Sequence, residues 1–178
     1  GHFLSDIELF DNEFFGISNA EAHAMDPHQR LFMEVAYLAL VQAGADKQSV
    51  MGAAVGVFLG FATTSDWTAV CRDAKQAVSV SSNLGSDAAA AAGRVSYLLG
   101  LKGPAFAVNT ACSSSLVALD AAVQNLRLDR CSSAVAGGVN LQLHYDPWAG
   151  FCAMQAVSKD GQCKTFDASA DGFGRAES

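Results

Sequence analysis

Three short apolar segments alternate with segments of helical periodicity, and this alternation restricts the possible folds more than any other feature. The apolar segments are Ala53–Leu59, Pro104–Val108 and Ser133–Leu143. The first is apolar throughout, which is typical of a central strand in a parallel sheet, and Gly60 is expected to end it. The second is short and bounded by glycine and proline, so we expect a buried strand. A helical segment separates the second from the third, and this strand–helix–strand order predicts a right-handed crossover in a layered α/β fold.

The clearest helix start lies at Asp26–Gln29, where an aspartate cap precedes a proline at the first helical position. This helix is expected to reach about Ala43 and to stop at Gly44. The residues expected on its buried face are Leu31, Val35, Leu38 and Ala39. His23 and His28 lie five apart across the helix start, so they share no helical face and are expected at the surface.

A second helix is expected from the Ser86-Asp87 cap to Leu99, closed by Gly100. Its five consecutive alanines would permit close packing against a neighbour. The preceding segment, residues 61–82, is polar and mixed, and we expect only a short helix spanning Asp66 to Lys75. The pair Gly137-Gly138 is expected to interrupt the last strand and to mark a close backbone approach to a ligand or another segment.

Cys112 lies where the strand ending at Val108 turns directly into a helix, along which Leu116, Leu119, Val123 and Leu126 form one apolar stripe. A helix that begins at Ser113 or Ser114 would direct unpaired N–H groups and the positive end of its dipole at the Cys112 sulfur. Cysteines in such positions have pKa values of about 3.5–7.5, and the same N–H groups can hold an oxyanion. We therefore interpret Cys112 as a nucleophile for acyl transfer.

Other catalytic classes fit the sequence less well. No Gly-x-Ser-x-Gly motif surrounds Ser113, Ser114 or Ser115, which excludes the usual serine-hydrolase elbow. A cysteine protease needs a base and an orienting group, and the sequence places none of the four histidines (His2, His23, His28 and His144) beside Cys112. Either further sequence completes the site, or the chain is not an enzyme by itself.

Metal sites are not expected. Cys131, His144, Cys152 and Cys163 lack the compact spacing of a zinc site. The segment from Asp167 to Gly172 matches the first half of a calcium loop, but Ser178 stands where the bidentate glutamate is needed.

Composition further restricts the number of domains, the class of partner and the cellular compartment. The 178 residues fit one domain, and 51% hydrophobic residues suffice for a buried sheet. A net charge of −7 disfavours nucleic acid or an anionic membrane as the partner, and no apolar run reaches the roughly 18 residues of a membrane span. Five cysteines without a CxxC motif indicate the reducing cytoplasm. Because the chain has no initiator methionine and no closing element, we expect it to be a fragment.

Four stretches resemble the β-ketoacyl synthase domains of modular type I polyketide synthases. The most specific is Asn109–Leu119, which reads Asn-Thr-Ala-Cys-Ser-Ser-Ser-Leu-Val-Ala-Leu. The others are Glu21–Leu31, Gly93–Pro104 and Asp160–Phe173, in the family's own order. The resemblance implies that residues 1–178 are a partial ketosynthase domain, the N-terminal half only of a thiolase-like layered α/β/α/β/α fold. The family's nucleophile corresponds to Cys112, whose backbone N–H is implied to contribute to the oxyanion hole.

The implied activity is that of an acyltransferase of the 3-oxoacyl-carrier-protein synthase type. The cysteine accepts an acyl chain from the phosphopantetheine arm of an acyl carrier protein. A malonyl-type extender then loses CO2, and its enolate attacks the acyl-cysteine in a Claisen condensation. The family's two catalytic histidines and its lysine belong to the C-terminal half, so the fragment alone is expected not to condense.

The resemblance also implies partners, and the sequence departs from it at two places. We expect an acyl carrier protein, a homodimer paired through the strand before the nucleophile, and no cofactor bound by the chain. Arg127 and Arg130 are candidates for contact with an acidic carrier protein. The alternative is that they form a solvent-exposed helix end without a partner. Asn109 replaces the family's usual aspartate, and the chain ends Arg175-Ala-Glu-Ser178 where Arg-Gly-Glu-Gly is usual.

Three alternatives stay open from the sequence. The parent protein could be a ketosynthase of fatty acid biosynthesis, a thiolase-like acyltransferase that uses coenzyme A esters, or a non-condensing transfer or structural domain that keeps the cysteine.

Overall fold

The computed structural model describes residues 1–61 and 66–178. Its elements are, in chain order, α1 (Asn12–Phe15), α2 (Asn19–Ala24), α3 (Pro27–Gln42), α4 (Lys47–Val50), β1 (Val55–Phe61), α5 (Asp66–Asp73), α6 (Val80–Gly85), α7 (Ala88–Leu98), β2 (Ala105–Val108), the 3-10 turn η1 (Ala111–Ser113), α8 (Ser114–Arg127), β3 (Ser133–Val139) and α9 (Tyr145–Ala153). They form two compact units. The larger holds residues 7–61 and 78–139, and the smaller holds residues 1–6, 66–77 and 140–178.

The larger unit is built on a parallel sheet with strand order β2-β1-β3. β1 is buried at every position, which confirms the predicted central strand. It continues through Gly60 to Phe61, so the predicted stop is wrong. β3 also pairs through both of its glycines, Gly137 with Leu59 and Gly138 with Gly60, so the predicted interruption is wrong.

β2 corrects another expectation, because it is an edge strand rather than a buried one. In the described part of the chain β1 is its only strand neighbour, and Phe106 is 41% exposed. A strand of four residues with an open edge leaves N–H and C=O groups free to pair with another chain.

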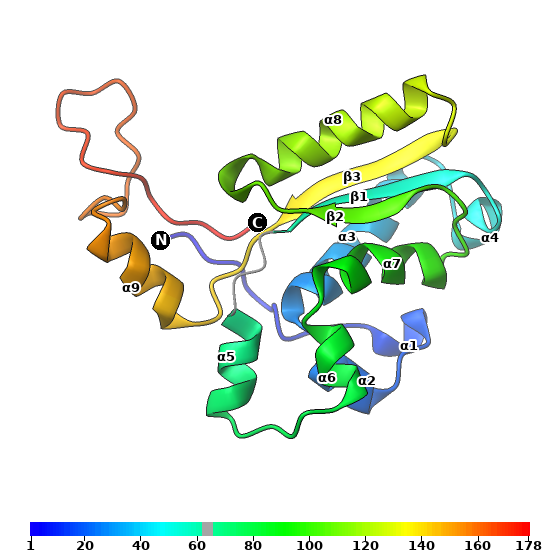
Figure 1. Cartoon of the computed structure of the whole chain (residues 1–178), viewed down its shortest axis with the longest axis horizontal. Helices are drawn as coiled ribbons and strands as arrows, with labels where there is room; N and C mark the ends of the chain where they lie inside the picture. Colours follow the sequence, from blue (N-terminus) through cyan, green and yellow to red (C-terminus); the bar gives the residue numbers. More distant parts are fainter. Residues whose placement is uncertain (62–65) are drawn as a thin grey trace. The chain divides into compact units, whose positions relative to one another are not determined.

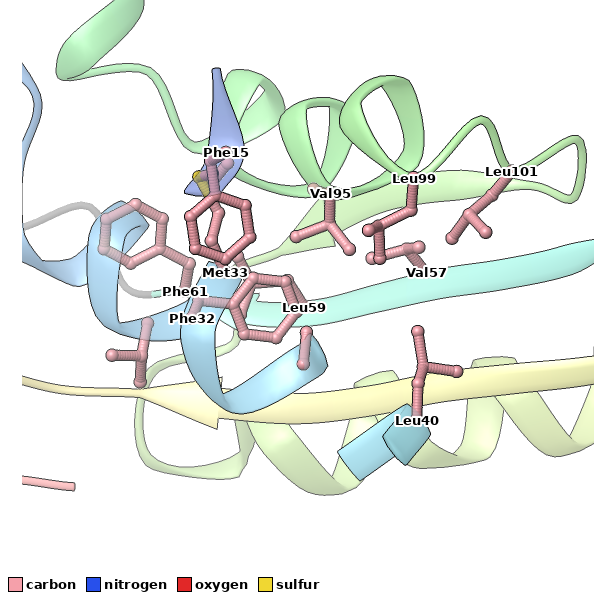
Figure 2. Close-up of a cluster of buried hydrophobic side chains, with 14 of the residues drawn as sticks. Phe15, Phe32, Met33, Leu40, Val57, Leu59, Phe61, Val95, Leu99 and Leu101 are labelled. Atoms are coloured by element: carbon pink, nitrogen blue, oxygen red, sulfur yellow. The ribbon is translucent and has the colours of Figure 1, made fainter. Parts of the chain in front are cut away.

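Helices cover both faces of this sheet (Figure 1), with α3 and α7 on one face and α8 on the other. The side chains of β1 alternate between them, as a strand requires. Val57 and Leu59 join the cluster under α3 and α7, where Val95 and Leu99 point at the strand (Figure 2). Phe58 points to the opposite face, into a smaller cluster with Ala118 and Ala122 of α8. This is the predicted layered α/β arrangement.

The start and stop of α3 are confirmed, and its predicted buried face is wrong except at Leu31, which is half-buried and packs against the core. The Asp26 carboxylate accepts from the His28 N–H at 2.9 Å, and Gly44 has a φ of 82°. The buried apolar side chains are Phe32, Met33, Ala36 and Leu40, whereas Val35, Leu38 and Ala39 are exposed. The helix is apolar around most of its circumference, so periodicity did not identify the face that meets the sheet.

The two histidines around this helix start differ in their surroundings. His23 is exposed, as predicted. His28 is only 2% exposed, so the surface prediction is wrong for it. Its Nδ1 lies 2.6 Å from the Asp26 carboxylate and its ring packs against Phe61. The paired carboxylate compensates for the burial of the imidazole.

The alanine-rich helix α7 follows its prediction closely. Asp87 caps it by accepting from the N–H groups of Ala89 and Ala90, and Gly100 has a left-handed φ of 67°. Ala91 and Ala92 are fully buried, which confirms the close packing expected from small side chains.

The smaller unit contains α5 and α9. The short helix predicted around Asp66 is confirmed by α5, although part of the segment 61–82, residues 62–65, lies outside the described residues. His144 caps α9 and its Nε2 lies 3.1 Å from Asp73 of α5. Among the described residues, no helix is long and apolar enough to cross a membrane.

Candidate active site

Cys112 lies in the predicted place, at the turn between the end of β2 and the start of α8. It occupies the middle of η1, the 3-10 turn that precedes the helix, and it is exposed. The helix begins at Ser114, as expected from the sequence. The thiol is therefore accessible to a substrate and next to the N-terminal end of a 14-residue helix.

The turn has an unusual backbone. Ala111, directly before Cys112, has a φ of 55°, a left-handed conformation that residues with a Cβ rarely adopt. Its N–H donates to Asn109 Oδ1 at 3.0 Å. Its carbonyl oxygen accepts from Ser114 Oγ at 2.7 Å, and the same hydroxyl accepts from the Thr110 N–H at 2.9 Å. Side chains on both sides of Cys112 thus hold the turn.

The N–H groups of the turn differ in whether they have an acceptor. Those of Ala111 and Thr110 bind side-chain oxygens, as described above. The Ser113 N–H donates to the Thr110 carbonyl at 3.4 Å, and the Ser114 N–H donates to the Ala111 carbonyl. The Cys112 N–H has no acceptor among residues 1–61 and 66–178. A donor beside the sulfur is therefore available for an oxyanion.

Two glycines bring the start of α8 onto the sheet. A Cβ at Gly60 would lie 2.6 Å from the backbone carbon of Ser114 and from the nitrogen of Ser115. A Cβ at Gly138 would lie 2.8 Å from the Ser115 Cβ. The two glycines are paired neighbours on β1 and β3. This confirms the prediction that the second glycine of the Gly137-Gly138 pair marks a close approach, here to another segment of the chain.

The apolar stripe predicted along α8 is present, but it faces away from the sheet. The residues that face the sheet are Ser114, Ala118, Ala122 and Asn125. Leu116 is 69% exposed and Leu119 is 51% exposed. Small side chains let the helix approach the strands closely, and the larger ones remain on its outer face.

The remaining cysteines and the candidate metal ligands do not form a common site in the described part of the chain. None of the five cysteines forms a disulfide within the described residues: Cys131 is buried, Cys71 is half-buried, and Cys112, Cys152 and Cys163 are exposed. In the described part of the chain, no group of three or more His, Cys, Asp or Glu side chains could hold a metal ion.

The carboxylates of the calcium-like segment have partners within the chain. Asp167 accepts from the Ser169 hydroxyl at 2.6 Å, and Asp171 and Asp160 both bind the Lys164 ammonium, at 2.8 and 2.9 Å. Hydrogen bonds from Ser158 and then Lys164 lower the pKa of Asp160 to about 2. These groups form an ion network that organises the C-terminal loop.

Sequence reasoning missed the roles of Asn109 and Gly60 in this site, and it did not identify which backbone groups the Ser114 hydroxyl binds. The available signals were weak. Asparagine and serine commonly bond nearby backbone groups, but the sequence does not say which groups, and a glycine at the end of an apolar strand was interpreted as a stop.

Comparisons with known proteins agree over the whole chain. A family model described as "Beta-ketoacyl synthase, N-terminal domain" matches residues 1–178. The highly reducing polyketide synthase dmxL2 of Cryptosporiopsis sp. (strain 8999) is 46% identical over 99% of this chain and 7% of its own length. A phenolphthiocerol/phthiocerol polyketide synthase of Mycobacterium tuberculosis is 49% identical over 99% of this chain and 9% of its own length.

Solved structures agree as well. The ketosynthase from module 6 of the bacillaene synthase of Bacillus subtilis 168 superposes with a TM-score of 0.87 and 37% identity, over 98% of this chain and 29% of that one. The oxazolomycin ketosynthase domain OzmH KS7 of Streptomyces albus JA3453 superposes with a TM-score of 0.86 and 34% identity, over 98% and 30%. The chain spans less than a tenth of the two curated relatives and under a third of these solved chains.

Proposed function

This chain belongs to the β-ketoacyl synthase family, and on that premise we propose that it supplies the nucleophile of a polyketide-synthase ketosynthase, Cys112. Its fold is the thiolase-like fold of the ketosynthase domains with which it superposes. Ketosynthases of polyketide synthases are acyl-transferring enzymes. One observation carries the proposal: an exposed thiol next to the N-terminal end of a helix, with its own N–H unoccupied in the described part of the chain.

The first stage of the proposed reaction is acyl loading. The Cys112 thiolate attacks the thioester carbonyl carbon of an acyl chain carried on the phosphopantetheine arm of an acyl carrier protein. A C–S bond to Cys112 forms, the negative charge moves to the carbonyl oxygen, and the Cys112 N–H stabilises it. When the tetrahedral intermediate collapses, the C–S bond to the arm breaks and the arm leaves as a thiolate that takes a proton. The arm is a part of the substrate, and no cofactor of the chain is required.

The second stage is condensation. A malonyl-type extender on the carrier protein loses CO2, and the resulting enolate carbon attacks the acyl carbon on Cys112 to give a β-ketoacyl thioester. The enolate oxygen needs hydrogen-bond donors, which the family supplies from histidines. In this chain His28 is buried against Asp26, and His144 binds Asp73. We therefore assign condensation to the complete domain, of which residues 1–178 form the N-terminal part.

The outer face of α8 supports this assignment. Leu116 and Leu119 are more than half exposed, and Val117 and Leu126 are each 37% exposed. An exposed apolar stripe of this kind marks an interaction surface. In a layered α/β/α/β/α fold, the helix that starts at the nucleophile is covered by the second half of the domain, so the stripe is the expected contact.

The alternative functions receive less support. The relatives described above are polyketide synthases, which favours polyketide assembly over fatty acid synthesis, coenzyme A chemistry or a non-condensing role. For the carrier protein, Arg127 and Arg130 at the exposed end of α8 remain our candidates for contact with acidic residues. We place the reaction in the cytoplasm, away from nucleic acid and membrane.

Thiol labelling tests the nucleophile. At neutral pH, Cys112 of the complete ketosynthase should react with iodoacetamide before the other four cysteines, as measured by peptide mass spectrometry after short exposure. Cys152 and Cys163 are also exposed, so they are internal controls for accessibility alone. Faster labelling at either of them would contradict the assignment, because only Cys112 lies at the start of α8.

Crosslinking tests the dimer. We propose that the open edge of β2 pairs with β2 of a second copy, since this edge is unpaired in the described residues. Cysteine introduced by Ala105→Cys should form a crosslink between the two copies with a short bifunctional reagent, whereas the same change at Ala39, exposed on α3, should not. A monomeric and fully active ketosynthase would refute this pairing.

A further inference from the structure

The peptide that joins Ala111 to Cys112 carries two groups that matter for acyl loading. Its N–H is the Cys112 donor that lacks an acceptor in the described part of the chain, and its carbonyl oxygen belongs to Ala111. Because a trans peptide is planar, these two groups point in opposite directions and turn together. Any bond that fixes the Ala111 carbonyl therefore also fixes the direction of the Cys112 N–H.

Ser114 makes two such bonds, because its backbone N–H and its hydroxyl both donate to the Ala111 carbonyl oxygen. Only the hydroxyl bond is lost in a Ser114→Ala variant. The Ser114 Oγ donates to the Ala111 oxygen at 2.7 Å and accepts from the Thr110 N–H at 2.9 Å, so the hydroxyl is used both as a donor and as an acceptor. A hydrogen bond to a carbonyl also polarises its peptide, which makes the N–H on the other side a better donor. Ser114 thus affects both the direction and the strength of the N–H that would meet an oxyanion.

Ser114 is held in place by the sheet rather than by the exposed turn. It is 6% exposed, and it lies against Gly60, where a Cβ would come within 2.6 Å of its backbone carbon. Water cannot easily replace a hydroxyl in so closed a position. The neighbouring Ser115 is exposed and is not part of this pair of bonds.

Asn109 fixes the other side of Ala111. Its Oδ1 accepts from the Ala111 N–H at 3.0 Å. Since Ala111 has a φ of 55°, which its Cβ disfavours, the residue needs bonds at both of its polar groups to keep this conformation. Asn109 supplies the acceptor for the N–H, and Ser114 supplies both donors to the carbonyl oxygen, its N–H and its hydroxyl.

We propose that Ser114 and Asn109 are positioning residues that orient the Cys112 N–H toward the oxyanion of acyl loading. This inference rests on the proposed role of Cys112 as the nucleophile. It assigns the two residues to stabilisation of the tetrahedral intermediate, and not to activation of the thiolate.

Two reactions of the same sulfur separate these roles. Loading from acetyl-pantetheine passes through an oxyanion, whereas alkylation by iodoacetamide does not. In the complete ketosynthase, Ser114→Ala should slow acetyl loading at least about 10-fold and change the alkylation rate of Cys112 less than about 2-fold. Ser115→Ala is the matched control and should change neither rate. Acetyl loading is followed by intact mass spectrometry.

Two further variants make the test independent of how well Ser114→Ala folds. Asn109→Ala removes the acceptor and should slow loading selectively, while Asn109→Asp keeps an acceptor oxygen and should retain most of the loading rate. Ala111→Gly removes the Cβ that disfavours a positive φ. In the Ala111→Gly background, Ser114→Ala should therefore slow acetyl loading by only about 3-fold or less.

Each outcome has a defined meaning. Equal losses in the rates of acetyl loading and alkylation would show that the two residues only maintain the structure of the turn, which would overturn the proposal. Unchanged loading in Ser114→Ala, and in Asn109→Ala, would also overturn it. If instead Cys112→Ala still accepts the acetyl group, the proposed nucleophile fails, whatever Ser114 and Asn109 do.

Discussion

Replacement of Cys112 by alanine is expected to abolish acyl loading of the complete ketosynthase and to lower β-ketoacyl product formation by at least about 10³-fold. The variant lacks the sulfur that forms the thioester, while the exposed position of Cys112 leaves the packing of the turn unchanged. Intact mass spectrometry after incubation with acyl-pantetheine measures loading directly.

Cys152→Ala is the matched control, since Cys152 is another exposed cysteine outside any disulfide. It should load at the rate of the unmodified protein. Decarboxylation of the malonyl-type extender should be measured in parallel, because that step does not require the acyl-cysteine. A Cys112→Ala variant that still forms a covalent acyl adduct would show that another residue is the nucleophile.

Substitution of Gly60 by alanine is expected to destabilise the domain by about 3 kcal/mol and to reduce acyl loading together with stability. The added methyl group would lie 2.6 Å from the backbone of Ser114 and Ser115. Backbone atoms cannot move aside as the end of a flexible side chain can, so β1 and α8 must separate. Denaturant unfolding of the complete ketosynthase gives the free-energy change.

Gly93→Ala serves as its control. A Cβ at Gly93 would meet nothing within 4 Å, and the residue lies inside α7, so this change should be neutral or stabilising by up to about 1 kcal/mol. If Gly60→Ala were equally neutral, the close approach of α8 to the sheet would not be a requirement of the fold.

Local signals predicted the elements well. Asp26 and Pro27 identified the start of α3, Asp87 identified the start of α7, and the apolar run after residue 53 identified β1. The turn that holds Cys112 was also predicted, because a strand followed at once by a helix is visible in a single sequence. Each of these depends on residues close together in the chain.

Burial was predicted less well, and the reason is packing between distant segments. In α8 the apolar stripe of Leu116 and Leu119 did not indicate which face meets the sheet, and the small residues Ala118 and Ala122 pack there against Phe58. In α3, Val35 was expected inside and is exposed. Which side of an apolar helix meets a sheet depends on the shapes of both surfaces. The sequence of the helix alone contains no information about the shape of the sheet.

The sequence does not indicate that the hydrogen bonds at this helix start meet at Ala111. Asn109 and Ser114 are ordinary residues for the start of a helix, and only the backbone direction shows that they bond the same residue from both sides. The positive φ of Ala111 was hidden too, since alanine gives no sign of a left-handed conformation.

The central place of β1 also has a consequence for how the chain folds during synthesis. β1 precedes both of its partner strands, which begin only at Ala105 and Ser133. Until both have been made, an apolar strand with two open edges must persist, and such a strand is prone to aggregate. α3 precedes it and can cover one face early, whereas the face that carries Phe58 stays open until α8 emerges. Synthesis of α8 is therefore the step at which the second face of β1 becomes covered.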